Sequence, residues 1–132
     1  MRLVVHVDGG SRGNPGPAAA AAVVSTPDGE VLDEASEVIG VATNNVAEYR
    51  ALLLGLRRAR ALGATEIEIV NDSELVARQV NGLYKVKHAD MRPLFETARA
   101  ELGRFERWSV RNVPRAQNAA ADALVNAALD AA

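Results

Sequence analysis

Three apolar segments follow one another at the start of the chain, and residues that favour turns separate them. The first is nearly continuous over residues 2–7, which is typical of a strand in the centre of a sheet. A glycine- and proline-rich stretch over residues 9–17 predicts a loop, and residues 18–25 and 31–39 predict two more strands. Three consecutive strands with short connections indicate an antiparallel meander, so everything downstream must pack on a sheet that begins antiparallel.

The rest of the chain alternates between the 3.6-residue period of helices and the two-residue period of strands. The predicted elements are helices at 43–62, 73–80, 91–102 and 118–131, strands at 65–71 and 107–113, and loops at 85–90 and 114–117. This order predicts an α/β fold with a mixed five-stranded sheet, three antiparallel strands and then two parallel ones, and helices packed on both faces.

Length and composition indicate one cytoplasmic domain. With 132 residues, 48% of them hydrophobic, the chain can bury a core, which excludes a disordered protein. The absence of cysteine excludes disulfides and thiolate metal sites and suits a reducing cytoplasm. No apolar run reaches the roughly 18 residues that a membrane span needs. We therefore expect a cytoplasmic monomer with no membrane partner.

Four acidic residues lie where the predicted elements begin or end, namely Asp8, Glu48, Asp72 and Asp122. Asp8 is expected to end the first strand and Asp72 the fourth. If these strands are parallel neighbours, the two carboxylates meet at the carboxyl edge of the sheet, where ligands of open α/β sheets bind. Helical spacing places Glu48 on the sheet-facing side of its helix.

Each acid also fits a local structural role. These roles are a turn for Asp8, a capping box begun by Asn45 for Glu48, a cap of the short helix by Asp72 or its neighbour Ser73, and a helix-dipole contact for Asp122. Together, however, crowded carboxylates would repel one another and raise one another's pKa unless cations neutralised them. Oxygen ligands without cysteine suit Mg²⁺ or Mn²⁺ rather than Zn²⁺. Two such ions roughly 3.5–4 Å apart can promote phosphodiester hydrolysis.

Four segments of the chain carry a specific resemblance. In chain order they are DGGSRGNPGP at 8–17, TNNVAEYRALLLGL at 43–56, NDSELV at 71–76 and PRAQNAAADALVNAAL at 114–129. Together they closely resemble the type 1 ribonuclease H family. The YKVKH stretch at 84–88 resembles the bacterial and archaeal form that lacks the long basic protrusion. The resemblance implies that residues 1–132 form a single ribonuclease H domain with the ribonuclease H-like fold.

The resemblance also implies an activity and a set of metal ligands. The expected enzyme is an endonuclease that hydrolyses the RNA strand of RNA–DNA hybrids by a two-metal-ion mechanism, leaving 5′-phosphate and 3′-hydroxyl ends. Two Mg²⁺ or Mn²⁺ ions would be held by Asp8, Glu48, Asp72 and Asp122. The expected substrate-binding residues are Gly9, Gly10, Asn14, Asn44, Asn45, Lys85 and Lys87. Apart from the resemblance, helix capping would account for Asn44 and Asn45, and a solvated charge cluster for the two lysines.

The chain departs from the family in the loop before the last acid, where many members carry a histidine. Residues 114–118 contain none, and Arg115 is expected to take part of that role as a cation near the leaving phosphate. A net charge of −2 is also unusual for a nucleic-acid-binding protein. Two alternatives remain: another metal-dependent nuclease of the same fold, and a non-catalytic module that binds hybrids.

Overall fold

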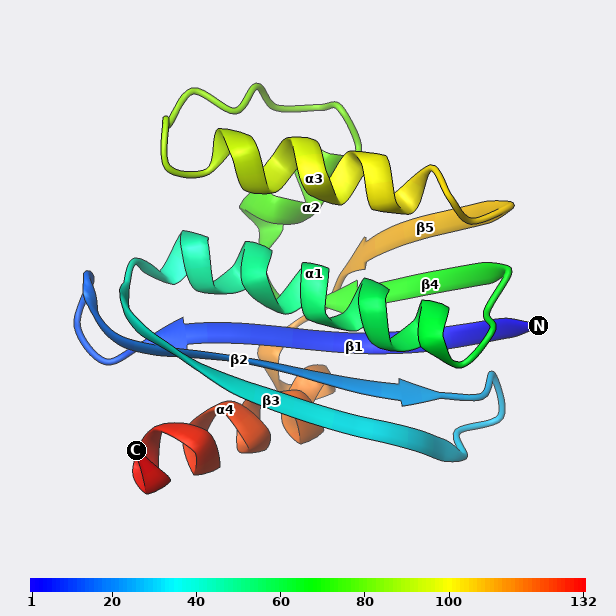
Figure 1. Ribbon diagram of the computed structural model, residues 1–132, viewed down its shortest axis with the longest axis horizontal. Coiled ribbons are helices and arrows are strands. Elements are labelled where there is room, and N and C mark those ends of the chain that lie inside the picture. Colours follow the sequence, from blue (N-terminus) through cyan, green and yellow to red (C-terminus); the bar gives the residue numbers. More distant parts are fainter.

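The sheet has the strand order β3-β2-β1-β4-β5 in the computed structural model, which describes residues 1–132 (Figure 1). Its strands are β1 (Arg2–Ser11), β2 (Gly16–Ser25), β3 (Val31–Ala42), β4 (Glu66–Asn71) and β5 (Arg107–Asn112). The first three pair antiparallel, whereas β4 runs parallel to both β1 and β5. The predicted mixed sheet is confirmed.

Helices cover both faces of this sheet, as predicted (Figure 1). They are α1 (Asn44–Ala61), α2 (Glu74–Val80) and α3 (Arg92–Leu102) on one side and α4 (Ala119–Ala131) on the other. The alanines of β2 explain how both layers approach so closely. Ala20 and Ala22 belong to the main core beneath α1, whereas Ala19 and Ala21 pack with Val125 of α4. None of these helices combines the length and hydropathy that a membrane crossing requires.

Several predicted boundaries are wrong, and pairing between strands explains the largest error. Residues 9–17 are not one loop, because Gly9, Gly10 and Ser11 continue β1 and pair with the alanines of β2. Only residues 12–15 connect the two strands. The third strand also runs beyond residue 39 to Ala42, and residues 115–118 form a 3₁₀ turn rather than an open loop. Local glycine content predicted a loop where cross-strand hydrogen bonds stabilise a strand.

The start of α1 does not have the capping box that was the alternative role for Glu48. Thr43, not Asn45, is the N-cap residue, and its hydroxyl accepts a hydrogen bond from the Val46 amide at 3.2 Å. Ser73 caps α2 in the same way, with its hydroxyl 3.3 Å from the Val76 amide. Both caps fix where the helices begin next to Glu48 and Asp72.

Gly9 allows α1 to lie directly against β1. A Cβ atom at this position would stand 2.1 Å from the carbonyl oxygen of Ala47, so no side chain fits. We expect Gly9→Ala to lower the free energy of unfolding by about 3 kcal/mol, since the helix or strand must shift. Gly10→Ala is the matched control, because its Cβ would meet only the Val125 side chain at 3.7 Å. Urea denaturation of both variants measures the difference, and equal stabilities would contradict the close contact.

Candidate active site

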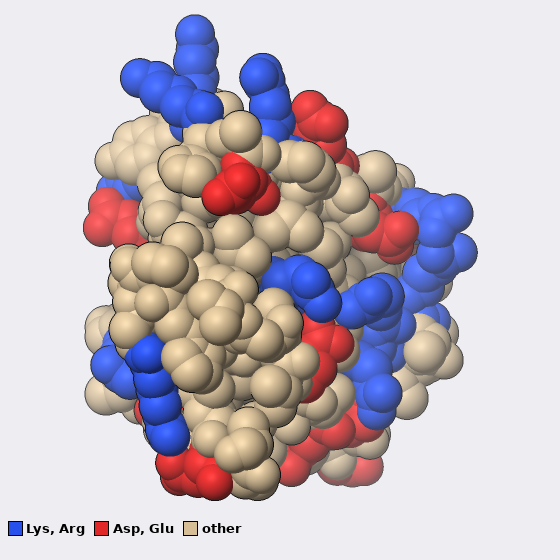
Figure 2. Space-filling model, turned by 60° about the vertical axis from the view of Figure 1, so that its left-hand side comes forward, with Lys and Arg blue, Asp and Glu red and all other residues tan.

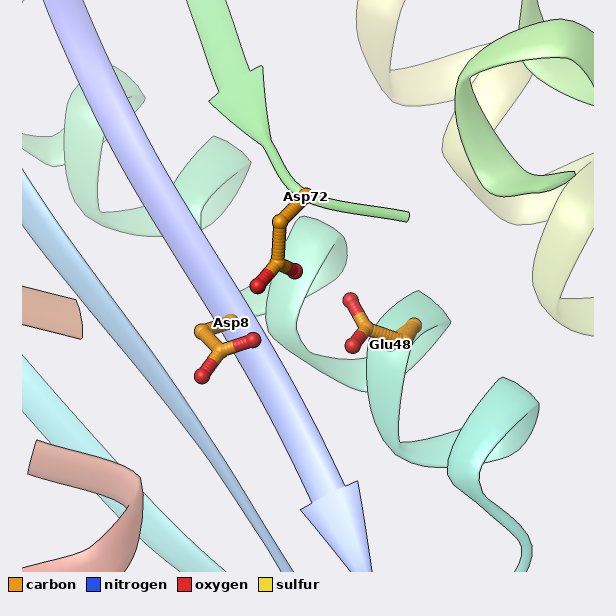
Figure 3. Close-up of side chains that lie close together, drawn as sticks. All are labelled: Asp8, Glu48 and Asp72. Atoms are coloured by element: carbon orange, nitrogen blue, oxygen red, sulfur yellow. The ribbon is translucent and has the colours of Figure 1, made fainter. Parts of the chain in front are cut away.

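Three carboxylates converge where β4 ends beside β1 (Figure 3). The prediction that Asp8 ends β1 is wrong, because the strand continues to Ser11. Asp8 lies two residues beyond the last β1–β4 pair, His6 with Val70. Asp72 follows the last residue of β4, and Glu48 lies in the second turn of α1. One oxygen from each of Asp8, Glu48 and Asp72 lies within 4.8 Å of the others. The parallel pairing and the helix face thus bring these three predicted residues together.

Burial and like charge raise the pKa values at this cluster. Asp8 is only 5% exposed, and loss of solvation, followed by the nearby charges of Asp72 and Asp122, raises its pKa to about 8. Loss of solvation, followed by Asp8 and Asp72, also raises the pKa of Glu48 well above its usual value. Without a bound cation, ionisation of all the carboxylates together is therefore unfavourable. A hard divalent cation would relieve this repulsion, and the all-carboxylate donor set fits such an ion.

Asp122 approaches the cluster from α4, on the side of Asp8, and lines the same cleft. Its charge and a side-chain hydrogen bond help to raise the pKa of Asp8, although it is not one of the three acids whose oxygens all lie within 4.8 Å of one another. The guanidinium of Arg115 donates to its Oδ1 at 3.0 Å, and the Asn126 amide lies 3.5 Å from Oδ2. The structure thus places Arg115 at the site, as expected, in an ion pair with the fourth acid.

These residues line a cleft of about 510 Å³. Of the predicted substrate-binding residues, Gly9, Gly10, Asn44 and Asn45 also line it. Asn14 lies beside the cleft instead, and its Oδ1 accepts a hydrogen bond from the Asn44 amide at 3.1 Å. Asn44 Oδ1 in turn accepts from the Ser11 amide at 2.9 Å. These bonds fix the loop over residues 12–15 to the start of α1 and leave the Nδ2 groups of both asparagines free to donate.

Lys85 and Lys87 line a different cavity. The exposed loop between α2 and α3 carries both residues, and the cavity beneath it measures about 680 Å³. Tyr84, Arg92 and Phe95 also line this cavity. In Figure 2, lysine and arginine side chains project from the top of the molecule, the end where Figure 1 shows this loop. The expected cationic residues therefore form a separate surface from the carboxylate cleft.

Sequence reasoning did not assign a role to several residues of the cleft. These are Ser11, Val125, Asn126 and Leu129. Helical spacing could have identified Asn126, which lies one turn after Asp122 on the same face of α4. No sequence signal joins Arg12 to Asp130, although their ion pair of 2.6 Å ties the β1–β2 loop to the end of α4.

Comparisons with known proteins agree with this architecture. The model of the family described as reverse transcriptase-like matches residues 6–128. A bifunctional protein of Mycobacterium tuberculosis is 53% identical over all of this chain, which spans only 36% of that relative's length. Ribonuclease HI of Halobacterium salinarum is 46% identical over 98% of this chain and 65% of its own length.

Solved ribonuclease H structures have the same fold as this chain. The crystal structure of RNase H1 from Halobacterium salinarum superposes with a TM-score of 0.97 at 45% identity, covering all of both chains. LC11-RNase H1, solved in complex with an RNA/DNA hybrid, gives a TM-score of 0.93 at 40% identity and covers 97% of this chain and 96% of its own.

Proposed function

The chain belongs to the reverse transcriptase-like family, within the ribonuclease H-like domains, and on that premise we propose that it hydrolyses the RNA strand of RNA–DNA hybrids. The observation that carries this proposal is the convergence of Asp8, Glu48 and Asp72, with oxygens within 4.8 Å, on an open cleft. A module that only bound hybrids would gain nothing from like charges in a site for phosphates. The relative bound to an RNA/DNA hybrid supports the same class of substrate.

The acidic residues are proposed to hold two Mg²⁺ or Mn²⁺ ions. Asp8, Glu48 and Asp72 would form the shared site, and Asp122 would complete the second from α4. When bound, such ions neutralise the carboxylates and the phosphate and activate the attacking water. Hydrolysis breaks the bond between phosphorus and the 3′ oxygen, which takes up a proton, and leaves a 5′-phosphate on the other fragment.

The neighbouring polar groups are proposed to recognise the hybrid. The free Nδ2 groups of Asn14 and Asn44 can donate to 2′-hydroxyl or sugar oxygens, which distinguish RNA in a wide, shallow minor groove. Asn45, Gly9 and Gly10 line the same cleft, where their backbone groups can approach the bound strand. Lys85 and Lys87, which line a separate cavity, would contact phosphates of the DNA strand, and such contacts add affinity without reading sequence.

Arg115 is proposed to act as a fixed positive charge beside the leaving phosphate. Arg115→Ala is expected to lower kcat about tenfold, with KM little changed, because one charged donor is lost from the cleft. The loss should be the same factor from about pH 6 to pH 9, since a guanidinium stays protonated throughout. Steady-state kinetics over this range measure it. A loss confined to one limb of the pH profile would show a proton-transfer role instead.

Cleavage of an end-labelled RNA–DNA hybrid in Mg²⁺, in Mn²⁺ and with a chelator tests the proposed function. The same panel should include double-stranded RNA, double-stranded DNA and single strands. We expect metal-dependent cleavage of the RNA in the hybrid alone. Preference for duplex DNA would favour another nuclease of this fold, and binding of the hybrid without turnover would favour the non-catalytic alternative.

We also propose that residues 1–132 act as a monomeric domain in the cytoplasm. The absence of cysteine supports the reducing compartment. Light scattering coupled to size-exclusion chromatography tests the oligomeric state, and a mass twice that of one chain would overturn the proposal.

A further inference from the structure

The loop that carries Lys85 and Lys87 has very few hydrogen bonds to the rest of the molecule. It connects α2 to α3 without helix or strand structure. Its first residues are fixed, because the amides of Leu83 and Tyr84 both donate to the Arg78 carbonyl, at 2.8 and 3.2 Å. Its last residues form a turn in which Met91 donates to the His88 carbonyl at 3.1 Å. Between these two ends, residues 85–87 make no backbone hydrogen bond to other backbone groups.

One side chain reaches this middle segment. The Nε2 group of Gln79, in α2, donates to the carbonyl of Lys85 at 3.5 Å. It is the only hydrogen bond between residues 85–87 and the rest of the protein. Packing helps at one position, where Val86 is partly buried against the main core. The placement of both lysines thus depends on one amide and one small apolar contact.

Gln79 is itself held from the opposite side. It is 3% exposed, and its neighbours in α2, Val76, Ala77 and Val80, are buried and apolar. The hydroxyl of Tyr49, a fully buried residue of α1, donates to Gln79 Oε1 at 2.5 Å. Tyr49 directly follows Glu48 in α1. A buried amide is retained in a core when both of its ends are satisfied, and here those ends join α1 to the loop.

We propose that Gln79 is a positioning residue that fixes the Lys85–Lys87 segment relative to the helix that carries Glu48. This inference rests on the proposed function for its consequence, namely that the hybrid's DNA strand is held in register with the cleft. That Gln79 orders residues 85–87 does not depend on the proposed function. Losing the bond should free residues 85–87 while the carboxylate cluster stays intact.

The tested variant is Tyr49→Phe/Gln79→Leu. Removing both polar partners leaves no buried hydroxyl or amide unpaired, so the pair of changes is tolerated better than either alone. Val24→Ala is the matched control, since it removes buried core volume in β2, outside α2 and the loop. It reproduces a general loss of stability without touching the contact.

The rate at which a lysine-specific protease cuts the folded protein measures how ordered the loop is, and it needs no assay of activity. The only two lysines of the chain are Lys85 and Lys87, so cutting of the folded protein reports this segment alone. Loss of one hydrogen bond should raise the rate of cutting in the double variant about fivefold, whereas Val24→Ala should stay near wild type. Equal rates in wild type and double variant, or an equal rise in the control, would overturn the proposal.

Kinetics on the hybrid then test the consequence. The double variant should show a KM raised about fivefold and an unchanged kcat, because phosphate contacts weaken while the cleft is intact. The affinity for the hybrid should also depend less steeply on salt concentration than in the wild type, and approach the dependence of the Lys85→Ala/Lys87→Ala variant. Unchanged KM and salt dependence, or a fall in kcat alone, would contradict the positioning role. If the wild type cleaves no hybrid, the proposed function fails, and the protease result still decides the inference about the loop.

Discussion

Asp72→Asn is expected to abolish metal-dependent cleavage of the RNA–DNA hybrid, with a loss of about 10³-fold or more. The substitution keeps the size of the side chain but removes one negative ligand from a cluster whose oxygens lie within 4.8 Å of one another. Weakened binding of the cations removes charge stabilisation worth several kcal/mol in the transition state. Initial rates with excess labelled hybrid in Mg²⁺ provide the measurement.

Glu106→Gln is the control for this variant. It makes the same change from acid to amide at an exposed residue that forms no ion pair and lies just before β5. Its rate should equal that of the wild type. Substantial metal-dependent cleavage by Asp72→Asn would remove Asp72 from the site and would undermine the proposed mechanism.

The second large effect is on stability, because the carboxylate cluster opposes folding when no cation is bound. Folding raises the pKa of Asp8 from 3.8 to about 8. The folded state therefore holds a proton that the unfolded state has already released, and stability falls as pH rises towards and through 8. Two unit charges about 5 Å apart repel by roughly 3 kcal/mol at an effective dielectric constant near 20. We expect chelator-treated protein to be less stable at about pH 9 than at about pH 7.

His6 does not obscure this comparison. Burial, followed by the charge of Arg111, lowers its pKa from 6.5, so its effect on stability lies at more acidic pH. Mg²⁺ or Mn²⁺ should raise the melting temperature, and more so at the higher pH. Cation at 1,000 times its dissociation constant adds about 4 kcal/mol. Thermal unfolding in chelator and in metal, at both pH values, measures this effect. Equal melting temperatures under all four conditions would show that the cluster neither strains the fold nor binds cations.

Periodicity was sufficient to predict the sheet and the convergence of Asp8, Glu48 and Asp72. The alternation of residues 65–71 identified β4, and its parallel pairing with β1 brings Asp72 beside Asp8. The spacing along α1 placed Glu48 on the face that meets the sheet. These features follow from local patterns and from the few topologies that such an order of elements allows.

Features that depend on contacts between distant residues were predicted less well. Gly9 and Gly10 suggest a loop by composition, but they are strand residues because β2 pairs with them. Thr43 rather than Asn45 caps α1, since both residues have suitable side chains and only the path of the chain decides between them. The ion pair between Arg115 and Asp122 and the contact of Gln79 with Lys85 are equally invisible in the sequence.

Binding of Mn²⁺, followed by the loss of the free-ion signal in electron paramagnetic resonance, tests the metal site most directly. We predict saturable binding to the wild type and binding weakened by about 100-fold or more in Asp72→Asn, while Glu106→Gln keeps the wild-type affinity. Equal affinity for Mn²⁺ in the wild type and in Asp72→Asn would contradict the assignment of these converging carboxylates as the metal centre of a nuclease.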